Sequence, residues 1–254
     1  MEIALIQTSL QWENPEANRI HFQKCFDSLK GSEDLIVLPE MFTTGFTMRP
    51  EKIPSQEAGL TLEWMRECAS RHNAALAGSL VFKEGTQYFN RLIFMFPDGT
   101  YEYYDKRHTF TLAGEDKVYN RGTERKTVRY GDFTFCMQIC YDLRFPVWSR
   151  NTDDYDVLLY VANWPDTRIA AWDTLLRARA IENMSYVLGV NRIGDDPNGL
   201  AYNGHSGVYD PLGNRLAFSE NDEILTVRLE KGVLTDARES LKFLQDRDTF
   251  NLEL

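Results

Sequence analysis

The sequence lacks the features that mark several large protein classes. Its 254 residues carry 28 lysines and arginines against 38 aspartates and glutamates, which gives a net charge of -10. This acidity argues against nucleic acid or an anionic membrane surface as a partner, because phosphate binding needs a basic face. No apolar run approaches the roughly 18 residues of a membrane-spanning helix, and the amino terminus enters an apolar strand without a basic leader. We therefore expect a cytoplasmic protein with no membrane partner.

Metal and cofactor motifs are missing as well. The chain has only four cysteines and four histidines, and neither set has the spacing of a zinc site. It contains neither the GxGxxG signature of dinucleotide-binding folds nor a P-loop. We expect free thiols and no cofactor.

The composition is that of one well-packed domain. A chain of 254 residues that is 43% hydrophobic can bury a large core. Because we find no internal repeat, low-complexity tract or linker, we expect a single α/β domain over residues 1–254. Four apolar residues near the carboxyl terminus need a surface to cover them, so we expect the tail, about residues 240–254, to pack on a partner subunit; they are Phe243, Leu244, Phe250 and Leu252.

Several apolar runs are typical of strands that are covered on both faces of a sheet. Residues 35–38, 74–82 and 156–162 are such runs, whereas residues 15–30 and 170–184 have the pattern of helices. Another strand covers 133–139 and is followed by Cys140 and a polar turn, which places a thiol at a strand-to-helix elbow. In open α/β sheets, the carboxyl ends of the strands are where ligands bind.

Two other reactive side chains also follow predicted strands. Glu40 comes just after the run 35–38, and Lys106 follows a hairpin whose turn is Pro97-Asp98-Gly99. Each residue alone is most simply interpreted as inert, since cysteines are often buried in cores and most glutamates and lysines are on the surface. Together with Cys140 they would form a useful trio, because a thiolate is the active nucleophile and a nearby cation lowers the pKa of a thiol.

The trio suggests acyl transfer through a thioester. Glu40 would accept the thiol proton as general base and pass it to the departing amine. Lys106 and the backbone N–H of Tyr141 would hold the oxyanion of the tetrahedral intermediate.

These residues resemble the signature of a known family. The order and spacing of three motifs are similar to those of the nitrilase superfamily of carbon–nitrogen hydrolases, and most similar to its omega-amidase branch; the motifs are Pro39-Glu40-Met41, Asp105-Lys106-Arg107-His108 and Cys140-Tyr141-Asp142-Leu143-Arg144-Phe145. The resemblance covers nearly the whole chain.

The resemblance implies a fold, an activity and an assembly. The fold would be an α-β-β-α sandwich, with Glu40, Lys106 and Cys140 as the catalytic triad and Glu115 as a second glutamate that helps to place the substrate. The activity would be hydrolysis of the terminal amide of short dicarboxylic monoamides such as 2-oxoglutaramate and 2-oxosuccinamate. The partners would be this small amide and a second copy of the chain in a homodimer, formed through the elements that follow the cysteine elbow.

Three other functions deserve comparison. A hydrolase of the same superfamily could act on a nitrile, an N-carbamoyl compound or a deaminated peptide amide. A catalytically silent binding protein could keep the fold, although all three triad residue types are present. A Cys–His dyad that uses His108 has no supporting local signature.

The residues that would contact the substrate are less clear from the sequence. Phe42 and Trp164 lie just beyond strand ends and are candidate pocket walls. Arg144 is expected to form an ion pair within the elbow. An arginine fork suits a substrate carboxylate, and Arg168, Arg192 or a residue of the long loop 109–127 could supply it.

Overall fold

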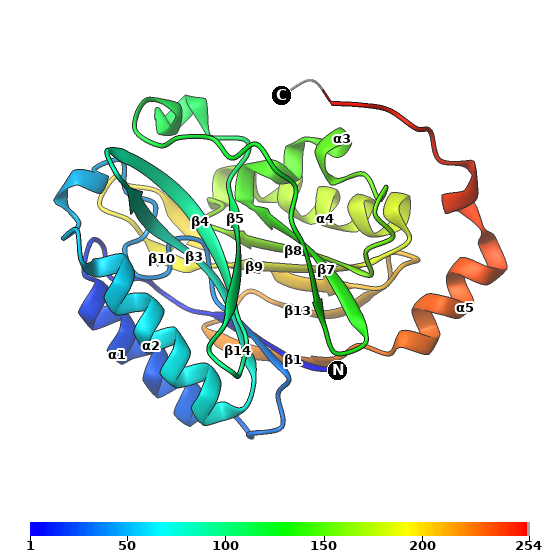
Figure 1. The fold of residues 1–254 in the computed structure, drawn as a ribbon, viewed down its shortest axis with the longest axis horizontal. Coiled ribbons are helices and arrows are strands. Elements are labelled where there is room, and N and C mark those ends of the chain that lie inside the picture. The colour runs from blue at the N-terminus through cyan, green and yellow to red at the C-terminus, as the bar shows by residue number, and fades with distance from the viewer. Residues whose placement is uncertain (253–254) are drawn as a thin grey trace.

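The computed structural model describes residues 1–252 and contains two six-stranded sheets that lie face to face (Figure 1). The first sheet has the order β14-β1-β2-β3-β4-β5, with β14 at Glu223–Arg228, β1 at Glu2–Gln7, β2 at Leu35–Val37, β3 at Ala75–Glu84, β4 at Gln87–Met95 and β5 at Tyr101–Asp105. The second has the order β13-β12-β9-β8-β7-β6, with β13 at Arg215–Ser219, β12 at Ser206–Tyr209, β9 at Tyr186–Asn191, β8 at Val157–Ala162, β7 at Phe133–Ile139 and β6 at Thr127–Tyr130.

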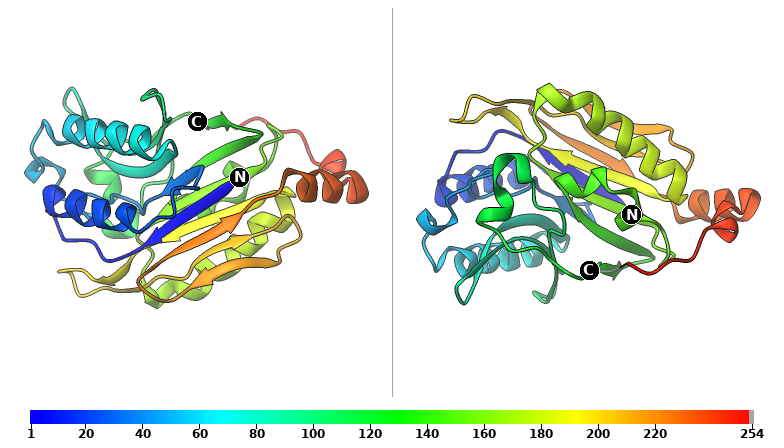
Figure 2. Two further views of the ribbon diagram at one scale, coloured as in Figure 1. Left: turned by 90° about the horizontal axis from the view of Figure 1, so that it is seen from below. Right: turned by 90° about the horizontal axis from the view of Figure 1, so that it is seen from above.

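Helices cover the outer faces of both sheets. The helices α1 (Pro15–Asp27) and α2 (Glu57–His72) lie on the first sheet, and α4 (Ile169–Asn183) lies on the second (Figure 2). The α-β-β-α sandwich that the resemblance implied is therefore confirmed. None of the helices in residues 1–252 combines the length and the apolar character needed to cross a bilayer.

The double coverage explains why the strands are apolar on both faces. In β1, Ile3 and Leu5 belong to the core between the two sheets, whereas Ala4 and Ile6 belong to the core beneath α1 and α2. Successive side chains of a strand point to opposite faces, so each such strand contributes to two cores. Continuous apolar runs rather than alternating ones are the result.

The strand directions bring the predicted reactive residues to one edge. The strands β1, β2 and β3 are parallel to one another, and so are β7, β8 and β9. The strand β5 is antiparallel to β4, which is antiparallel to β3, so β5 ends at the same edge as β2. The residues that directly follow β2, β5, β7 and β8 therefore lie at one edge of the sandwich, where the two sheets meet.

Two segments go beyond what the sequence patterns predicted. A small hairpin of β10 (Ile193–Asp195) and β11 (Ala201–Asn203) follows β9. The long loop before β6 contains two short 3₁₀ helices, η2 (Thr111–Ala113) and η3 (Glu115–Lys117).

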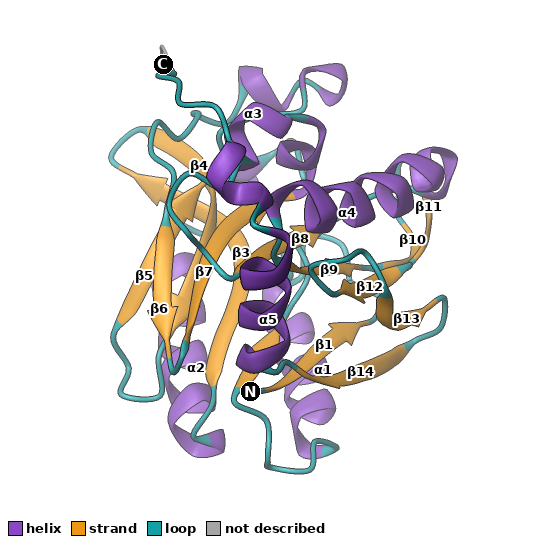
Figure 3. Cartoon of the chain, turned by 90° about the vertical axis from the view of Figure 1, so that its right-hand side faces the viewer, coloured by secondary structure: helices purple, strands orange, loops and turns teal. Residues whose placement is uncertain are grey.

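The carboxyl-terminal part extends away from the sandwich. The helix α5 (Lys231–Leu241) leads into a tail that runs along one side of the molecule (Figure 3). Arg247 fastens this tail, since its Nη1 donates to the backbone oxygen of Asn151 at 3.1 Å and to Asp154 Oδ1 at 2.7 Å. The side chains of Phe243, Phe250 and Leu252 remain exposed.

Candidate active site

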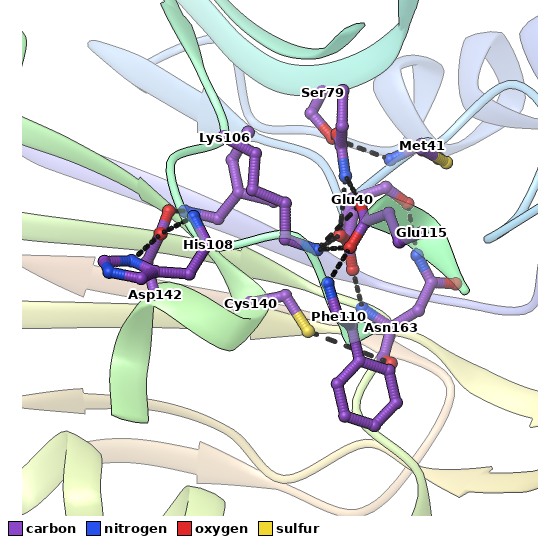
Figure 4. A network of polar contacts seen from close by, with 12 residues as sticks. Glu40, Met41, Ser79, Lys106, His108, Phe110, Glu115, Cys140, Asp142 and Asn163 are labelled. Atoms are coloured by element: carbon purple, nitrogen blue, oxygen red, sulfur yellow. Dashed lines mark hydrogen bonds and ion pairs between the residues drawn. The ribbon is translucent and has the colours of Figure 1, made fainter. Parts of the chain in front are cut away.

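The structure brings Glu40 and Lys106 into direct contact. The Lys106 Nζ donates to Glu40 Oε1 at 2.8 Å and to Glu115 Oε2 at 2.9 Å (Figure 4). All three side chains are buried, with exposed fractions of 1% for Lys106 and 0% for both glutamates. One ammonium thus lies between two carboxylates in an interior that excludes water.

Cys140 lies at the end of β7 in a strained conformation. It begins the short 3₁₀ helix η4 (Cys140–Arg144) with a φ of 45°, in the left-handed region that side chains other than glycine rarely adopt. Its Sγ lies 4.0 Å from the backbone oxygen of Asn163. The sharp turn presents the thiol to a cavity of about 640 Å³, which Cys140 borders together with Tyr141.

A buried carboxylate ties this elbow to the segment that carries Lys106. Asp142 Oδ2 accepts from the backbone N–H of Ile139 at 3.0 Å and from the Tyr104 hydroxyl at 2.8 Å. Asp142 Oδ1 accepts from the backbone N–H of His108 at 2.9 Å and lies 2.8 Å from the His108 ring Nδ1. The ring of His108 stacks on Phe145 at 3.7 Å. His108 therefore helps to connect the Cys140 elbow to the Lys106 segment through Asp142, and its ring forms no catalytic dyad with the thiol.

Two asparagines orient the carboxylate of Glu40. Asn90 Nδ2 donates to Glu40 Oε1 at 2.8 Å and to Glu115 Oε1 at 3.2 Å, while its Oδ1 accepts from the Ser79 hydroxyl at 2.8 Å. The backbone N–H of Asn163 donates to Glu40 Oε2 at 2.8 Å. Both oxygens of Glu40 are thereby fixed in place.

Neither asparagine is among the site residues that the sequence predicts. Asn163 could have been found, because it is the first polar residue after the buried strand β8, and this position also identified Cys140 after β7. Asn90 lies inside β4, where its side chain faces the glutamates only because the pairing with β3 sets the register. Nothing in the local sequence reveals that register.

Burial and charge act on the titratable groups in opposite directions. Burial disfavours the charged form of Lys106, but Glu115 and Glu40 outweigh it and raise the pKa of this ammonium above its usual value. Burial, followed by the charge of Glu40, raises the pKa of the Cys140 thiol well above its usual value, and Lys106 offsets this only in part. The expectation that the lysine makes a low-pKa thiolate is therefore wrong. A thiol with a raised pKa must give up its proton when the sulfur attacks.

The walls of the cavity include some of the predicted residues. Trp164, Arg144 and Arg168 line it. Phe42 does not, and the prediction that it forms a wall is wrong. Its ring is fully buried in the core beneath α1 and α2, where it packs at 5.5 Å from the ring of Phe22.

The expected ion pair of Arg144 is also absent from residues 1–252. Its guanidinium instead lies 5.0 Å from the ring centre of Trp164. Both side chains border the cavity, so Arg144 belongs to the mouth of the site rather than to the frame of the elbow.

The raised pKa of Cys140 predicts how this thiol reacts with iodoacetamide, which alkylates thiolates. Labelling should be slow near about pH 7 and should still be rising at about pH 9. Replacing Glu40 by glutamine removes a negative neighbour and should speed labelling at neutral pH. The rate is measured by mass spectrometry of the Cys140 peptide, with Glu63→Gln, at an exposed position on the outer side of α2, as the control. A labelling rate that reaches its plateau below about pH 8 would contradict the raised pKa of the Cys140 thiol.

The sequence and the fold both match known proteins along the whole chain. Residues 2–239 match the family model described as carbon-nitrogen hydrolase. The omega-amidase YafV of Yersinia enterocolitica is 44% identical over 256 residues, which cover 99% of this chain and 98% of that protein. The 2-oxoglutaramate amidase of Bacillus subtilis is 28% identical, and the match covers 96% of each chain.

One solved structure has the same fold. XC1258 of Xanthomonas campestris, described as a CN-hydrolase superfamily protein with an arsenic adduct in the active site, has a TM-score of 0.96 to this chain at 40% identity. The similarity covers 100% of this chain and 99% of that one.

Proposed function

This chain belongs to the carbon–nitrogen hydrolase family, and on that basis we propose that it is an omega-amidase that hydrolyses the terminal amide of short dicarboxylic monoamides such as 2-oxoglutaramate and 2-oxosuccinamate. The observation that carries the proposal is the near full-length similarity to the Yersinia omega-amidase. The Cys140 thiol at the cavity wall and the buried Lys106 ammonium between two carboxylates support the same chemistry.

The first half of the reaction forms a thioester. The Cys140 sulfur attacks the amide carbon while its proton moves to Glu40, which is a carboxylate beside the thiol. The carbonyl oxygen becomes an oxyanion. As the intermediate collapses, Glu40 returns the proton to the nitrogen, the carbon–nitrogen bond breaks and ammonia leaves. The acyl group remains on the sulfur.

The second half regenerates the thiol. Glu40 takes a proton from water, the resulting hydroxide attacks the thioester carbon, and the carbon–sulfur bond breaks as the proton passes to the sulfur. The products are a dicarboxylic acid and free enzyme. Because Asn90, Asn163 and Lys106 fix its two oxygens, Glu40 can serve both halves without reorienting.

Lys106 and Tyr141 are proposed to stabilise the oxyanion. The ammonium has three N–H donors, which are directed to Glu40 Oε1 and to both oxygens of Glu115. The longest of these bonds, 3.1 Å to Glu115 Oε1, is the one that the substrate oxygen would replace. The backbone N–H of Tyr141, next to the nucleophile, is the second donor. Removing one such donor typically costs about 3–4 kcal/mol of transition-state stabilisation.

Glu115 is proposed to hold both Lys106 and Phe110, a residue of the cavity wall, in position. Its Oε2 accepts from the backbone N–H of Phe110 at 2.6 Å as well as from Lys106. The Phe110 ring lines the cavity, so Glu115 links the position of the ammonium to the shape of the substrate site.

Turnover of a substrate panel tests the proposed function. The protein should release ammonia from 2-oxoglutaramate and 2-oxosuccinamate with a higher kcat/KM than from nitriles, N-carbamoyl compounds or deaminated peptide amides. Cys140→Ala should lower kcat by at least about 1000-fold because the nucleophile is gone, whereas Cys25→Ser on α1 should keep it. Both variants should keep the thermal melting profile of the parent protein.

Two outcomes of this panel would refute the proposal. Unchanged turnover by Cys140→Ala would remove the thioester mechanism. A preference for nitriles or carbamoyl compounds would place the chain elsewhere in the family.

We also propose that the protein is a cytoplasmic homodimer. Its four cysteines are free thiols, which suits a reducing compartment. The face that follows the cysteine elbow exposes apolar side chains, with Val147 of α3 (Pro146–Ser149) 51% exposed and Ile181 of α4 47% exposed. The tail residues Phe250 and Leu252 lie beside Val147 and extend this face. A second copy would cover these groups.

Light scattering of the purified protein tests the dimer. The expected mass is twice the 29.4 kDa of one chain. Val147→Asp and Ile181→Asp should shift the protein toward monomer, because a buried unpaired carboxylate is costly. Ile20→Asp on α1, an equally exposed position on a different helix, is the control and should leave the dimer intact. A monomeric parent protein would contradict the proposal.

A further inference from the structure

The cavity beside Cys140 carries more positive than negative charge. Among the described residues that line it, the charged ones are Asp196 and three arginines, Arg49, Arg144 and Arg168. A dicarboxylic monoamide brings a carboxylate into this space, and a carboxylate that leaves water needs a partner. An arginine fork is the group that best matches its geometry.

Two of the charges already have partners. Arg49 donates from Nε to Glu13 Oε1 at 3.1 Å and from Nη2 to Glu13 Oε2 at 3.0 Å, so its fork is occupied. Asp196 accepts from the backbone N–H of Asn198 at 2.8 Å and from the Tyr202 hydroxyl at 3.0 Å. Its charge is used to hold the turn of the β10–β11 hairpin.

Arg192 is part of the frame rather than of the cavity wall. It is 1% exposed, and its guanidinium lies 4.6 Å from the ring centre of Tyr202. Its Nε donates to the backbone oxygen of Ile193 at 3.1 Å, and its Nη2 donates to that of Asp195 at 3.0 Å. These bonds hold the hairpin to the end of β9.

Arg168 and Arg144 remain available. Neither guanidinium has an ion pair or a hydrogen bond to any residue in 1–252. Each lies against an aromatic ring, with Arg168 at 5.1 Å from the ring centre of Phe110 and Arg144 at 5.0 Å from that of Trp164. Such packing limits the motion of a guanidinium while leaving its N–H groups free to bind an anion.

Burial and contacts distinguish the two. Arg144 is exposed to solvent, whereas Arg168 is half-buried, and a charge pair is stronger where less water screens it. Two sets of contacts connect Arg168 to the neighbours of the nucleophile. The Phe110 ring, which packs against the Arg168 guanidinium, lies 4.9 Å from the ring of Tyr141. The backbone oxygen of Arg168 accepts from Trp164 Nε1 at 2.8 Å.

From these contacts we infer that Arg168 binds the distal carboxylate of the substrate and so selects acidic amides over neutral ones. This inference rests on the proposed amidase function and adds the residue that binds the end of the substrate opposite the amide. Arg144, at the solvent-exposed mouth, contributes positive charge without forming the specific pair.

A pair of matched substrates tests the assignment. Glutaramate carries the terminal amide and a carboxylate, and pentanamide has the same chain length without the charge. In Arg168→Gln, kcat/KM for glutaramate should fall on the order of 100-fold, chiefly through KM, because the lost pair holds ground state and transition state alike. For pentanamide, kcat/KM should change less than about threefold.

Two further variants and a binding measurement complete the test. Arg168→Lys should recover part of the loss, because it restores the charge without the fork. Arg144→Gln is the control and should keep the preference for glutaramate. Calorimetric binding of glutarate to the Cys140→Ala protein should be lost when Arg168→Gln is added.

The possible failures are distinguishable. Equal losses on both amides, or a preference that disappears in Arg144→Gln instead, would overturn the role of Arg168. If the parent protein turned over neither amide while glutarate still bound through Arg168, the amidase function would fail and the carboxylate site would stand.

Discussion

The structure depends on one buried ammonium held between two carboxylates. Removing a charge from water costs several kcal/mol, so Lys106 can be enclosed only because Glu40 and Glu115 accept hydrogen bonds from its ammonium. Burial, followed by the charge of Glu40, raises the pKa of the Cys140 thiol, and Lys106 offsets this only in part. Burial also raises the pKa of the Glu115 carboxyl. The raised pKa favours the protonated thiol, and the carboxylate of Glu40, which can take that proton, lies beside it.

The site belongs to neither sheet alone. Glu40 and Lys106 follow strands of the first sheet, whereas Cys140 and Asn163 follow strands of the second. Packing of the two sheets therefore assembles the acid, the ammonium and the thiol. The left-handed residues Met41, after Glu40, and Cys140 turn the chain sharply at this seam, and such strain persists only where the surrounding structure fixes it.

The sequence predicts the position of the site better than its details. Runs of apolar residues locate the strands, and the rule that ligands bind at carboxyl strand ends selects Glu40, Lys106 and Cys140. The same rule does not predict which way a side chain points. Phe42 follows the left-handed turn at Met41 and points into the core, whereas Trp164, which comes soon after β8, faces the cavity. The hairpin β10–β11 was missed because its strands have only three residues each.

Properties that depend on several side chains were also beyond the sequence. The direction of the pKa shift of Cys140 follows from the balance of burial, one ammonium and two carboxylates, and only coordinates give that balance. The free guanidinium of Arg144 is a similar case, since an ion pair depends on which acidic residues come near in the fold.

The central claim is that Cys140 carries the acyl group while ammonia leaves. Its most direct test is rapid acid quenching of the protein during turnover of 2-oxoglutaramate, followed by mass spectrometry of its peptides. The account predicts an acyl group on the peptide that contains Cys140, formed together with the first ammonia released. Ammonia that accumulates with no acyl group on Cys140 at any quench time, or with the acyl group on another residue, would contradict it.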